Sequence, residues 1–427
     1  MIDIELLRNS PDEVKKKIAT KRADPALVDS FTHLDREWRS VMKSMEEKRA
    51  EQKKLGEARK IEEAKKLKEE IKGLEEISKK LEGEREIAWI KIPNLPSDDT
   101  PVGKDENENK VLRSWGEVPR FPFKAKEHMD IGEALKIIDT QRASVVSGTR
   151  FGYLKGGAAV LEFALVQFAF DTLRDEKTLK KIAKKAGLTV NTKPFIPVVP
   201  PVMIKPDVYR RTGRIDPGME DERYHLPKDD LYLIGSAEHT LVPMHMDETI
   251  PEGELPIRYV GFSTSFRREA GSYGKDTKGI LRVHQFDKVE MESFTVPEDS
   301  RAEQEFLVAI QEYLMQELGL PYRVVAVCTG DMGGPDYRQL DIETWLPGQD
   351  RYRETHSSDL VADYQPRRLN MKVKRTAGKS ELLHVNDATC FAIGRMLIAI
   401  IENYQTEKGT VKVPKALQKY AGIKEIV

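Results

Sequence analysis

A charged segment in the second half of the chain holds side chains that could bind both a nucleotide and an amino acid. It reads FRREAGSYGKDTKGILRVHQFDKVEM from Phe266 to Met291, and its central loop contains three glycines. If residues 280–292 form a strand, alternate side chains lie on the same face. That face would carry Arg282, His284, Phe286, Lys288 and Glu290. On the preceding strand Arg267 and Glu269 share a face by the same rule, so we expect one strongly charged hairpin face.

The chemistry of these side chains suits a phosphorylated substrate. An arginine guanidinium is a planar fork that matches phosphate oxygens, and an aromatic ring such as Phe286 can stack on a nucleobase. A glutamate can accept a hydrogen bond from an amine or a hydroxyl group. The residues alone also allow a solvent-facing strand whose charges pair as salt bridges, and both interpretations stay open at this point.

The composition indicates a protein without a membrane segment or a disulfide framework. The chain has 427 residues, 39% of them hydrophobic and 33% charged, with a formal net charge of −1. Its two cysteines, Cys328 and Cys390, are too few for a four-cysteine zinc site, and we expect no zinc. The first residues lack the apolar stretch of a secretory signal, and the most apolar segments are too short to span a bilayer. We therefore expect a soluble, cytoplasmic protein.

Residues 29–90 have the composition and spacing of a coiled coil. They are rich in Glu, Lys, Arg, Leu and Ala, and they contain no proline. Apolar residues recur at spacings of three and four in two sets: Leu34, Trp38, Val41, Met45 and Leu55, then Leu67, Ile71, Leu74 and Leu81. The register is lost around Gly56, so we expect two helices, each about 45 Å long, folded back as a hairpin arm. Its charges form either a solvated surface or, near the tip, contacts to a large polyanion.

A linker with three prolines separates this arm from a region of globular composition. It spans residues 91–110, and we expect domains at 1–100 and 101–427. In the second domain the predicted strands follow one another through hairpins and loops rather than in regular βα alternation. This favours an α+β class with a mostly antiparallel sheet flanked by helices. The Walker and Rossmann glycine motifs do not occur in the sequence.

The hairpin resembles motif 2 of the class II aminoacyl-tRNA synthetases, and within that class the chain is similar to bacterial-type seryl-tRNA synthetases. The similarity covers nearly the whole chain in the same order: the long arm, the IPNLP…PVG linker, LIGSAEHTLV, CTGDMG, DYQPRRLN and AIGR…ENYQ. It implies ATP-dependent activation of L-serine to seryl-adenylate, then transfer of the seryl group to the 3′ end of serine tRNA. Selenocysteine tRNA is an implied acceptor only where the organism has one.

The resemblance also implies how ATP is held, in a bent form on the antiparallel sheet. Arg267 would contact the α-phosphate, Arg282 the γ-phosphate, and Glu269 the adenine edge. Phe286 and Arg395 would sandwich the adenine ring. The implied ATP-binding set is Arg267, Arg268, Glu269, Arg282, Val283, Phe286, Glu354, Thr355, His356, Ser357 and Arg395. We expect Arg267, Arg282 and Arg395 to be the catalytic residues, because adenylation needs positioning and charge neutralisation more than a dedicated base.

A metal site is implied by the stretch RYRETHSS. Glu354 and Ser357 match the family pattern Glu-x-x-Ser, whose oxygens hold a Mg²⁺ ion that bridges ATP phosphates. The chain departs from the family pattern at three nearby positions. His356 replaces a common small residue, Leu360 a common asparagine, and Asp387 the usual asparagine of NG(S/T).

For the amino acid the family uses a Thr-Ala-Glu loop, which is Ser236-Ala237-Glu238 in this chain. The resemblance implies that Glu238 holds the α-ammonium group and that Glu290 accepts a hydrogen bond from the serine hydroxyl. The implied serine-binding set is Ser236, Ala237, Glu238, Arg267, Glu290 and Thr389. His284 is a tempting general base, but we expect it to be structural.

The implied partners are serine tRNA, L-serine, ATP and a second copy of the chain. Pro200 and Pro201 resemble motif 1, which forms the dimer interface in class II enzymes. Arms of this kind lie across the long variable region of the tRNA and read its shape. Two alternatives remain open. One is an adenylating ligase with a different acceptor, although known relatives of that kind lack the arm, and the other is an RNA-binding paralogue with an inactive site.

Overall fold

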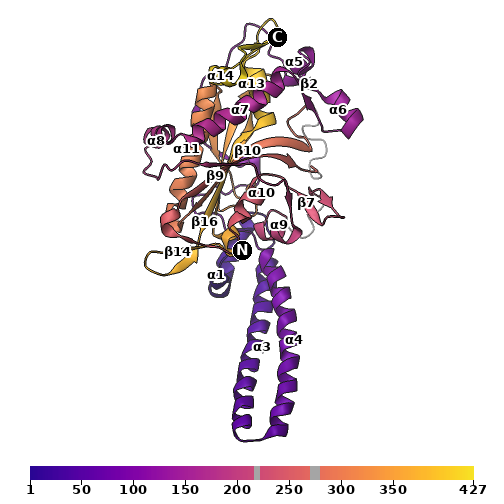
Figure 1. Ribbon diagram of the computed structural model, residues 1–427, viewed down its shortest axis with the longest axis vertical. Helices are drawn as coiled ribbons and strands as arrows, with labels where there is room; N and C mark the ends of the chain where they lie inside the picture. The colour runs from indigo at the N-terminus through magenta and orange to yellow at the C-terminus, as the bar shows by residue number, and fades with distance from the viewer. Residues whose placement is uncertain (216–221, 270–278) are drawn as a thin grey trace. The chain divides into compact units, whose positions relative to one another are not determined.

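The structure is a computed structural model of the chain (Figure 1). It describes residues 1–215, 222–269 and 279–427. The chain forms two compact units, Met1–Pro96 and Ser97–Val427. The sequence predicted domains at 1–100 and 101–427, and these limits remain a prediction, because compact units in the structure do not by themselves define domains.

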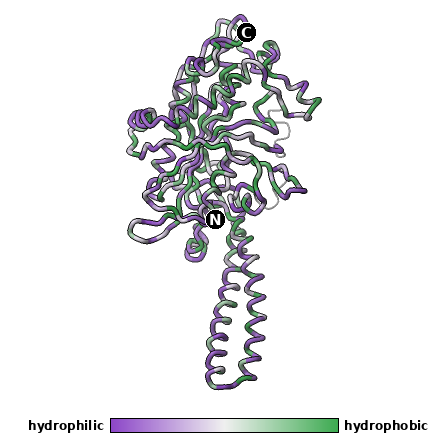
Figure 2. Tube along the Cα trace, in the orientation of Figure 1, coloured by the Kyte–Doolittle hydropathy of each residue, from purple (hydrophilic) through white to green (hydrophobic). Residues whose placement is uncertain are grey.

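The first unit is a long helical hairpin with two short helices before it. Its helices are α1 (Ile4–Asn9), α2 (Pro11–Thr20), α3 (Ala26–Glu57) and α4 (Ile61–Ile90). The two long helices run side by side (Figure 1) and bury Met45, Leu67 and Ile71 of the expected seam. Figure 2 shows that most of both helices is hydrophilic, with hydrophobic positions at intervals. The coiled-coil hairpin is therefore confirmed, although α3 continues through Gly56 and the chain reverses at residues 58–60.

A buried ion cluster joins three helices of this unit. The Asp35 side chain of α3 is only 2% exposed. Arg8 of α1 donates two hydrogen bonds to it, both at 3.0 Å. Arg39 of α3 donates at 3.0 Å, and Arg85 of α4 donates at 3.1 Å. Burial alone would raise the pKa of Asp35, but the hydrogen bond from Arg8 and the charges of the three arginines bring it below its ordinary value.

The second unit is organised around an eight-stranded sheet. In spatial order its strands are β1 (Lys110–Trp115), β11 (Tyr322–Ala326), β12 (Arg338–Leu346), β13 (Arg351–Ala362), β16 (His384–Ala392), β10 (Gln285–Thr295), β9 (Ile257–Phe266) and β4 (Ile196–Val198). All neighbours pair antiparallel except the edge strand β4, which pairs parallel with β9. The expected α+β class with a mostly antiparallel sheet is confirmed.

Three helices cover one face of this sheet: α7 (Gly157–Arg174), α11 (Ser300–Leu318) and α13 (Ile393–Asn403) (Figure 1). Val289 and Met291 of β10 point into the apolar core that these helices share with the sheet. Because side chains alternate along a strand, Glu290 of β10 lies on the other face. The same alternation places Thr389 of β16 beside it, since the two residues are register partners. The sheet therefore has one face for the core and one for polar chemistry.

Smaller elements complete the second unit. The helices are α5 (His128–Ala134), α6 (Thr140–Ser147), α8 (Glu176–Lys185), α9 (Pro206–Thr212), α10 (Glu238–Leu241), α12 (Tyr364–Leu369) and α14 (Lys415–Ala421), with 3₁₀ turns η1 (Glu106–Glu108), η3 (Val242–His245), η4 (Glu252–Glu254) and η5 (Pro297–Asp299). The short strands are β2 (Ile138–Asp139), β3 (Tyr153–Leu154), β5 (Met203–Ile204), β6 (His225–Leu226), β7 (Leu231–Leu233), β8 (Thr249–Pro251), β14 (Lys372–Lys374), β15 (Ser380–Leu382), β17 (Val411–Lys412) and β18 (Glu425–Ile426). Across the described stretches, none of the helices combines the length and the apolar character needed to cross a membrane.

The strand expected over residues 280–292 begins later than the alternation suggested. β10 starts at Gln285, and residues 279–284 form turns and bends. The alternating pattern continued through these residues, but their backbone does not pair with β9, whose last residue Phe266 lies opposite Gln285. Consecutive side chains before Gln285 can consequently face the same cavity, which a strand would forbid.

The Asp35 cluster yields a stability prediction. Asp35→Ala removes a buried carboxylate that three arginines share, and we expect unfolding of the first unit to become easier by about 3 kcal/mol. Because the pKa of Asp35 is lowered, its contribution is complete above about pH 4 and disappears as the pH falls through the lowered value. Thermal unfolding of the full chain, followed by helical circular dichroism, measures the change.

Asp29→Ala is the matched control for that experiment. Asp29 is in the same helix and lies 2.5 Å from Lys15, but its side chain is 65% exposed. An exposed ion pair contributes little, so this variant should unfold close to the wild type. Equal effects of the two substitutions would contradict a special role for the buried cluster.

Candidate active site

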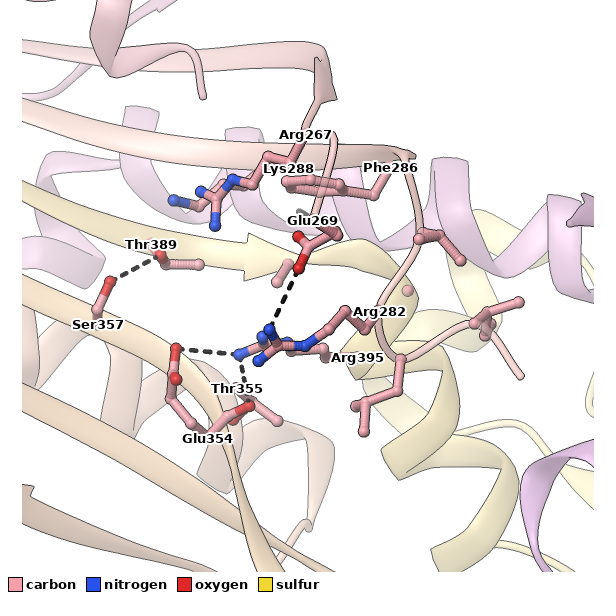
Figure 3. A pocket seen from close by; sticks show the side chains of 15 residues that line it. Arg267, Glu269, Arg282, Phe286, Lys288, Glu354, Thr355, Ser357, Thr389 and Arg395 are labelled. Carbon is pink, nitrogen blue, oxygen red and sulfur yellow. Dashed lines mark hydrogen bonds and ion pairs between the residues drawn. The ribbon is translucent and has the colours of Figure 1, made fainter. Parts of the chain in front are cut away.

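A cavity of about 210 Å³ opens on the polar face of the central sheet (Figure 3). Its lining residues are Arg267, Glu269, Ile280, Leu281, Arg282, Val283, Phe286, Lys288, Glu354, Thr355, Ser357, Thr389, Ala392, Gly394 and Arg395. They come from the ends of β9 and β10, from β13, and from the junction of β16 with α13. Residues that are far apart in the sequence thus meet because their strands are neighbours in the sheet.

Two ion pairs lie within this cavity. Arg282 Nη1 donates to Glu269 Oε2 at 3.2 Å, and Arg395 Nη1 lies 3.0 Å from Glu354 Oε1 (Figure 3). Arg395 also donates to the backbone carbonyl of Glu354 at 2.9 Å. Glu269 has a φ of 54°, in the left-handed region that a residue with a side chain adopts uncommonly. The site therefore combines cationic and anionic groups, which suits a polyanionic ligand that also carries hydrogen-bond donors.

Arg267 is a buried cation in the same cavity. Its guanidinium carbon lies 5.2 Å from the centre of the Phe286 ring, and its Nε donates to the carbonyl of Gly235 at 3.1 Å. Burial, together with the charge of Arg223, lowers the pKa of Arg267 from its ordinary value. An anion bound beside this guanidinium would offset the loss of hydration, so the geometry favours phosphate or carboxylate at this position.

The histidine on this hairpin has a structural role. His284 Nδ1 lies 3.0 Å from the backbone carbonyl of Arg267, and the backbones of the two residues are also hydrogen-bonded at 2.9 Å. The ring packs 5.3 Å from the ring of Phe151. These contacts hold the Arg267 backbone in place, and His284 is not among the side chains that line the cavity.

Below the cavity lies a chain of buried polar groups centred on Glu290, which is fully buried. Ser236 Oγ donates to its Oε2 at 2.6 Å, and Lys288 Nζ lies 2.5 Å from the same oxygen. Thr389 Oγ1 is 3.5 Å from Glu290 Oε1, and the Thr389 and Ser357 hydroxyls are 3.3 Å apart (Figure 3). Since 3.5 Å is long for a hydrogen bond, a small ligand hydroxyl beside this pair could contact Thr389 Oγ1 and Glu290 Oε1 at shorter distances.

Glu238 lies on the adjacent loop, at the start of α10. Its side chain is only 6% exposed. Its Oε1 accepts from Arg214 Nε at 2.5 Å and from Gln365 Nε2 at 3.0 Å. Both bonds end on one oxygen, so Oε2 remains the oxygen through which Glu238 can bind a further donor.

The structure brings most of the residues expected from the sequence to one place. The cavity lining includes Arg267, Glu269, Arg282, Val283, Phe286, Glu354, Thr355, Ser357, Thr389 and Arg395. Ser236, Ala237, Glu238 and Glu290 are buried and are not part of this lining. The expected glycine loop, residues 270–279, lies outside the described residues except for Gly279.

Two of the expected ATP-binding residues lie elsewhere. The guanidinium of Arg268 is placed 5.4 Å from the centre of the Tyr224 ring, and Arg268 does not line the cavity. His356 is buried with its ring 6.0 Å from Phe391 of the apolar core, and burial lowers its pKa to about 3. His356 thus faces the core side of β13 as a neutral ring. The guanidinium of Arg267 lies over the Phe286 ring, and the expected sandwich of adenine between Phe286 and Arg395 stays a prediction.

Two charged residues of the site were absent from the sets of binding residues expected from the sequence, although Lys288 was placed on the charged hairpin face. Lys288 lines the cavity and pairs with Glu290, and the alternation that placed both on one face was a sufficient signal to name it. Arg214 contacts Glu238 and Asp387, which are 24 and 173 residues away along the chain. No local pattern marks Arg214, because only the fold brings these three residues together.

The cavity wall offers oxygen ligands for a hard cation, although the described residues do not gather many metal-binding side chains at one point. Among the described residues, no group of three or more His, Cys, Asp or Glu side chains is arranged to hold a metal ion. Glu354 and Ser357 supply a carboxylate and a hydroxyl to the same cavity wall. Asp341 is the register partner of Ser357, and burial and the charge of Glu354 raise its pKa. A cation shared with a ligand's own oxygens would suit this donor set.

Two family comparisons cover both units of the chain. Residues 1–96 match the family described as seryl-tRNA synthetase N-terminal domain. Residues 221–404 match the family described as tRNA synthetase class II core domain (G, H, P, S and T). The chain is similar to the serine–tRNA ligase of Thermotoga neapolitana, with 41% identity over 442 residues and 100% of both chains covered. It is 38% identical to that of Syntrophotalea carbinolica over 434 residues, which covers 99% of this chain and 98% of the relative.

Solved structures agree with these relatives over the full length. The crystal structure of seryl-tRNA synthetase from Pyrococcus horikoshii complexed with ATP is 37% identical, with a TM-score of 0.91 and coverage of 100% of this chain and 99% of that one. Cytoplasmic serine–tRNA ligase from Naegleria fowleri in complex with AMP is 31% identical, with a TM-score of 0.87 and coverage of 100% and 98%.

Proposed function

The chain belongs to the seryl-tRNA synthetase family, and we propose that it performs the family reaction with the residues gathered in and beneath the cavity. It is a serine–tRNA ligase. The serine carboxylate attacks the α-phosphorus of ATP and expels pyrophosphate, which gives seryl-adenylate. The 3′-terminal hydroxyl of serine tRNA then takes the seryl group and AMP leaves. Because tRNA is charged where proteins are made, we place this activity in the cytoplasm.

The observation that carries the assignment of roles is the connection between the cationic cavity and the buried Glu290. Arg267, Arg282 and Arg395 line the same cavity, and we assign them to neutralising phosphate charge during adenylation. Phe286 is assigned to stacking on the adenine ring. Since Arg395 pairs with Glu354, binding of ATP would require this arginine to change partners if it also covers the adenine.

The serine pocket is assigned to the polar groups beneath. We assign the substrate carboxylate to Arg267, which lines the cavity, and the α-ammonium group to Oε2 of Glu238. The hydroxyl of serine would bind beside Thr389 and Glu290, whose own contact is 3.5 Å long, and would contact both side chains. The buried Ser236 and Lys288 hold Glu290 in position from its other oxygen. The side-chain pocket is therefore lined by groups that require a hydrogen-bonding partner.

Mg²⁺ fits the donor chemistry of the cavity wall. Glu354 and Ser357 offer oxygen ligands, and we propose that they hold the ion together with the ATP phosphates. When bound, the ion would offset negative charge on the phosphates. Arg267 and Arg282 act on the same charge from the opposite wall, and they hold the triphosphate in the orientation that serine attacks.

A dimer is proposed from the exposed apolar side chains between residues 145 and 203. Eight large hydrophobic side chains are exposed in this part of the chain: Val145, Val146, Tyr153, Val160, Phe163, Ile196, Val199 and Met203. They belong to α6, β3, α7, β4 and β5 or follow β4 directly, and Pro200 and Pro201 of the expected motif 1 lie among them. A second copy would cover these side chains. Sedimentation equilibrium showing only the single-chain mass would contradict the dimer.

A pair of assays distinguishes this function from its rivals. Serine-dependent exchange of label between pyrophosphate and ATP, measured with and without Mg²⁺, reports adenylation. Its absence would identify an inactive paralogue. Transfer of labelled serine to tRNA then separates a tRNA ligase from an enzyme that loads another acceptor, and failure of that second step alone would favour the latter.

Arg267→Ala should leave the fold intact and reduce serine-dependent exchange about a hundredfold. The reason is the loss of a charge-assisted contact in the transition state, which contributes on the order of 3 kcal/mol. Arg268→Ala is the matched control, because this neighbouring arginine lies over Tyr224 and should tolerate truncation far better. Comparable losses of exchange activity in both variants would contradict the assignment of phosphate contact to Arg267 and not to Arg268.

Glu290→Gln should narrow the preference for serine over alanine. A site that hydrogen-bonds a substrate hydroxyl leaves buried groups unpaired when the hydroxyl is missing, and such sites reject the analogue by as much as roughly 10⁴-fold. Glutamine keeps the shape but removes the charged acceptor. The measurement is kcat/KM of exchange for serine, threonine and alanine, with threonine expected between the others. If the ratio of kcat/KM for serine to that for alanine does not change, Glu290 does not recognise the hydroxyl group, and Thr389 becomes the candidate for that role.

Shortening the arm should separate the two reaction steps. We expect replacement of residues 46–75 by a short glycine-serine turn to preserve serine-dependent exchange and nearly abolish tRNA charging. The cut retains the Asp35 cluster, so the rest of the first unit keeps its packing. Removal of all of residues 29–90 would destroy that cluster and confuse the result. Equal loss of both activities in the shortened chain would show that the arm supports adenylation instead.

A further inference from the structure

Three carboxylates lie side by side on the polar face of the central sheet, one step beyond the proposed hydroxyl-binding residues. Glu292 of β10 is the register partner of Asp387 of β16, and Asp387 is the partner of Asp359 of β13. Along β10 and β16 this row is two residues from Glu290 and Thr389, a separation of about 7 Å. Like charges directly opposite each other destabilise a sheet, so this row requires a compensating cation.

Arg214, which follows α9, is that cation. Its Nη2 lies 3.1 Å from Asp387 and 3.9 Å from Asp359, and its Nη1 lies 3.5 Å from Asp336. Its Nε donates to Glu238 at 2.5 Å. One guanidinium therefore connects the acidic row to the residue proposed to bind the substrate ammonium.

The compensation by Arg214 is incomplete. Glu292 is fully buried, and within the described part of the chain neither of its carboxylate oxygens has a hydrogen-bond partner. Oδ1 of Asp359 is also buried and has no hydrogen-bond partner among the described residues. Burial and neighbouring carboxylates raise the pKa of Glu292, Asp387 and Asp359 well above their ordinary values. These raised pKa values mean that the carboxyl groups retain protons where no cation is near. A further cation could displace such a proton and pair with the carboxylate, and loss of Arg214 would leave more of the row open to that exchange.

We propose that Arg214 is a positioning residue that sets the side-chain charge of the amino acid that this enzyme activates. It orients Glu238 toward the α-ammonium group and offsets the acidic row beneath the hydroxyl-binding residues. The pocket is thereby suited to a neutral hydroxyl and unsuited to an amine in the same place. This inference rests on the proposed serine pocket, and it adds a residue to which that proposal assigns no role.

2,3-Diaminopropionate is the probe that isolates this effect. It matches serine in size but carries an amine where serine carries a hydroxyl, so the two substrates differ mainly in side-chain charge. With Arg214 present, an additional ammonium group would approach both Lys288, which already pairs with Glu290, and the Arg214 guanidinium. With Arg214 removed, the uncompensated carboxylates would favour the ammonium.

The experiment measures kcat/KM of ATP–pyrophosphate exchange with serine and with 2,3-diaminopropionate. The wild type should prefer serine. Arg214→Gln keeps hydrogen-bonding groups but removes the charge, and it should lower the ratio of the two values by at least about tenfold. An unchanged ratio, or a wild-type preference for 2,3-diaminopropionate, would overturn the proposal.

Arg258→Gln is the control for a purely structural effect. Arg258 is also fully buried and pairs with Glu303 at 2.6 Å, on β9 and α11 away from the cavity. This variant should lose thermal stability and leave the substrate ratio within about twofold of the wild type. A tenfold shift here too would show that the ratio responds to any lost buried ion pair, and the proposal would fail.

Arg214→Lys keeps the proposal testable if the glutamine variant does not fold. Lysine retains the charge but cannot contact several carboxylates at once with a planar fork. We expect kcat/KM for serine to fall while the substrate ratio stays within about threefold. A large change in the ratio of the two kcat/KM values, or an unchanged kcat/KM for serine, would contradict the two roles assigned to Arg214.

Failure of the proposed function can be distinguished from failure of this inference. Exchange with serine in the wild type is measured first, and its absence would refute serine activation itself. In that case the two amino acids are compared by calorimetric binding to wild type and Arg214→Gln, and a ratio of affinities that does not change would overturn the role of Arg214.

Discussion

The alternation of side chains across the central sheet is the constraint on which the rest of the catalytic unit depends. Val289 and Met291 face the helices, so Glu290 and Glu292 must face the other way. A shift of one residue in β10 would bury the carboxylates in the apolar core and expose the hydrophobic side chains. Folding of the core and assembly of the polar site are therefore the same event.

This arrangement concentrates charge in a region that excludes water. Every buried carboxylate beneath the cavity needs a donor or a proton, and the structure provides these unequally. Glu290 has Ser236 and Lys288 on one oxygen, whereas Glu292 has no partner among the described residues. A substrate that brings its own ammonium and hydroxyl groups completes the pairing around Glu290 and Glu238. In the proposed pocket, selectivity for the amino acid would follow from which buried groups lack a protein partner.

Local patterns were sufficient for the arm and for the chemical character of the site. The spacing of apolar residues in positions 29–90 predicts paired helices, because a coiled-coil seam is a property of sequence spacing alone. Alternation likewise predicted the face that carries Glu290. It failed before Gln285, where the residues have strand-like alternation but no partner strand. Strand pairing is decided by neighbours in space, and the pattern of one segment cannot report them.

The sequence by itself therefore determined the fold class, the hairpin arm and, through family resemblance, the reaction, and it predicted most of the residues that line the cavity. Tertiary structure alone decided which charges meet. It turned Arg268 toward Tyr224, packed His356 against the core, and brought Arg214 to Glu238 and Asp387. These outcomes depend on chain segments that are distant in sequence. Electrostatic pairing acts between atoms a few ångströms apart, and only the folded chain sets those distances.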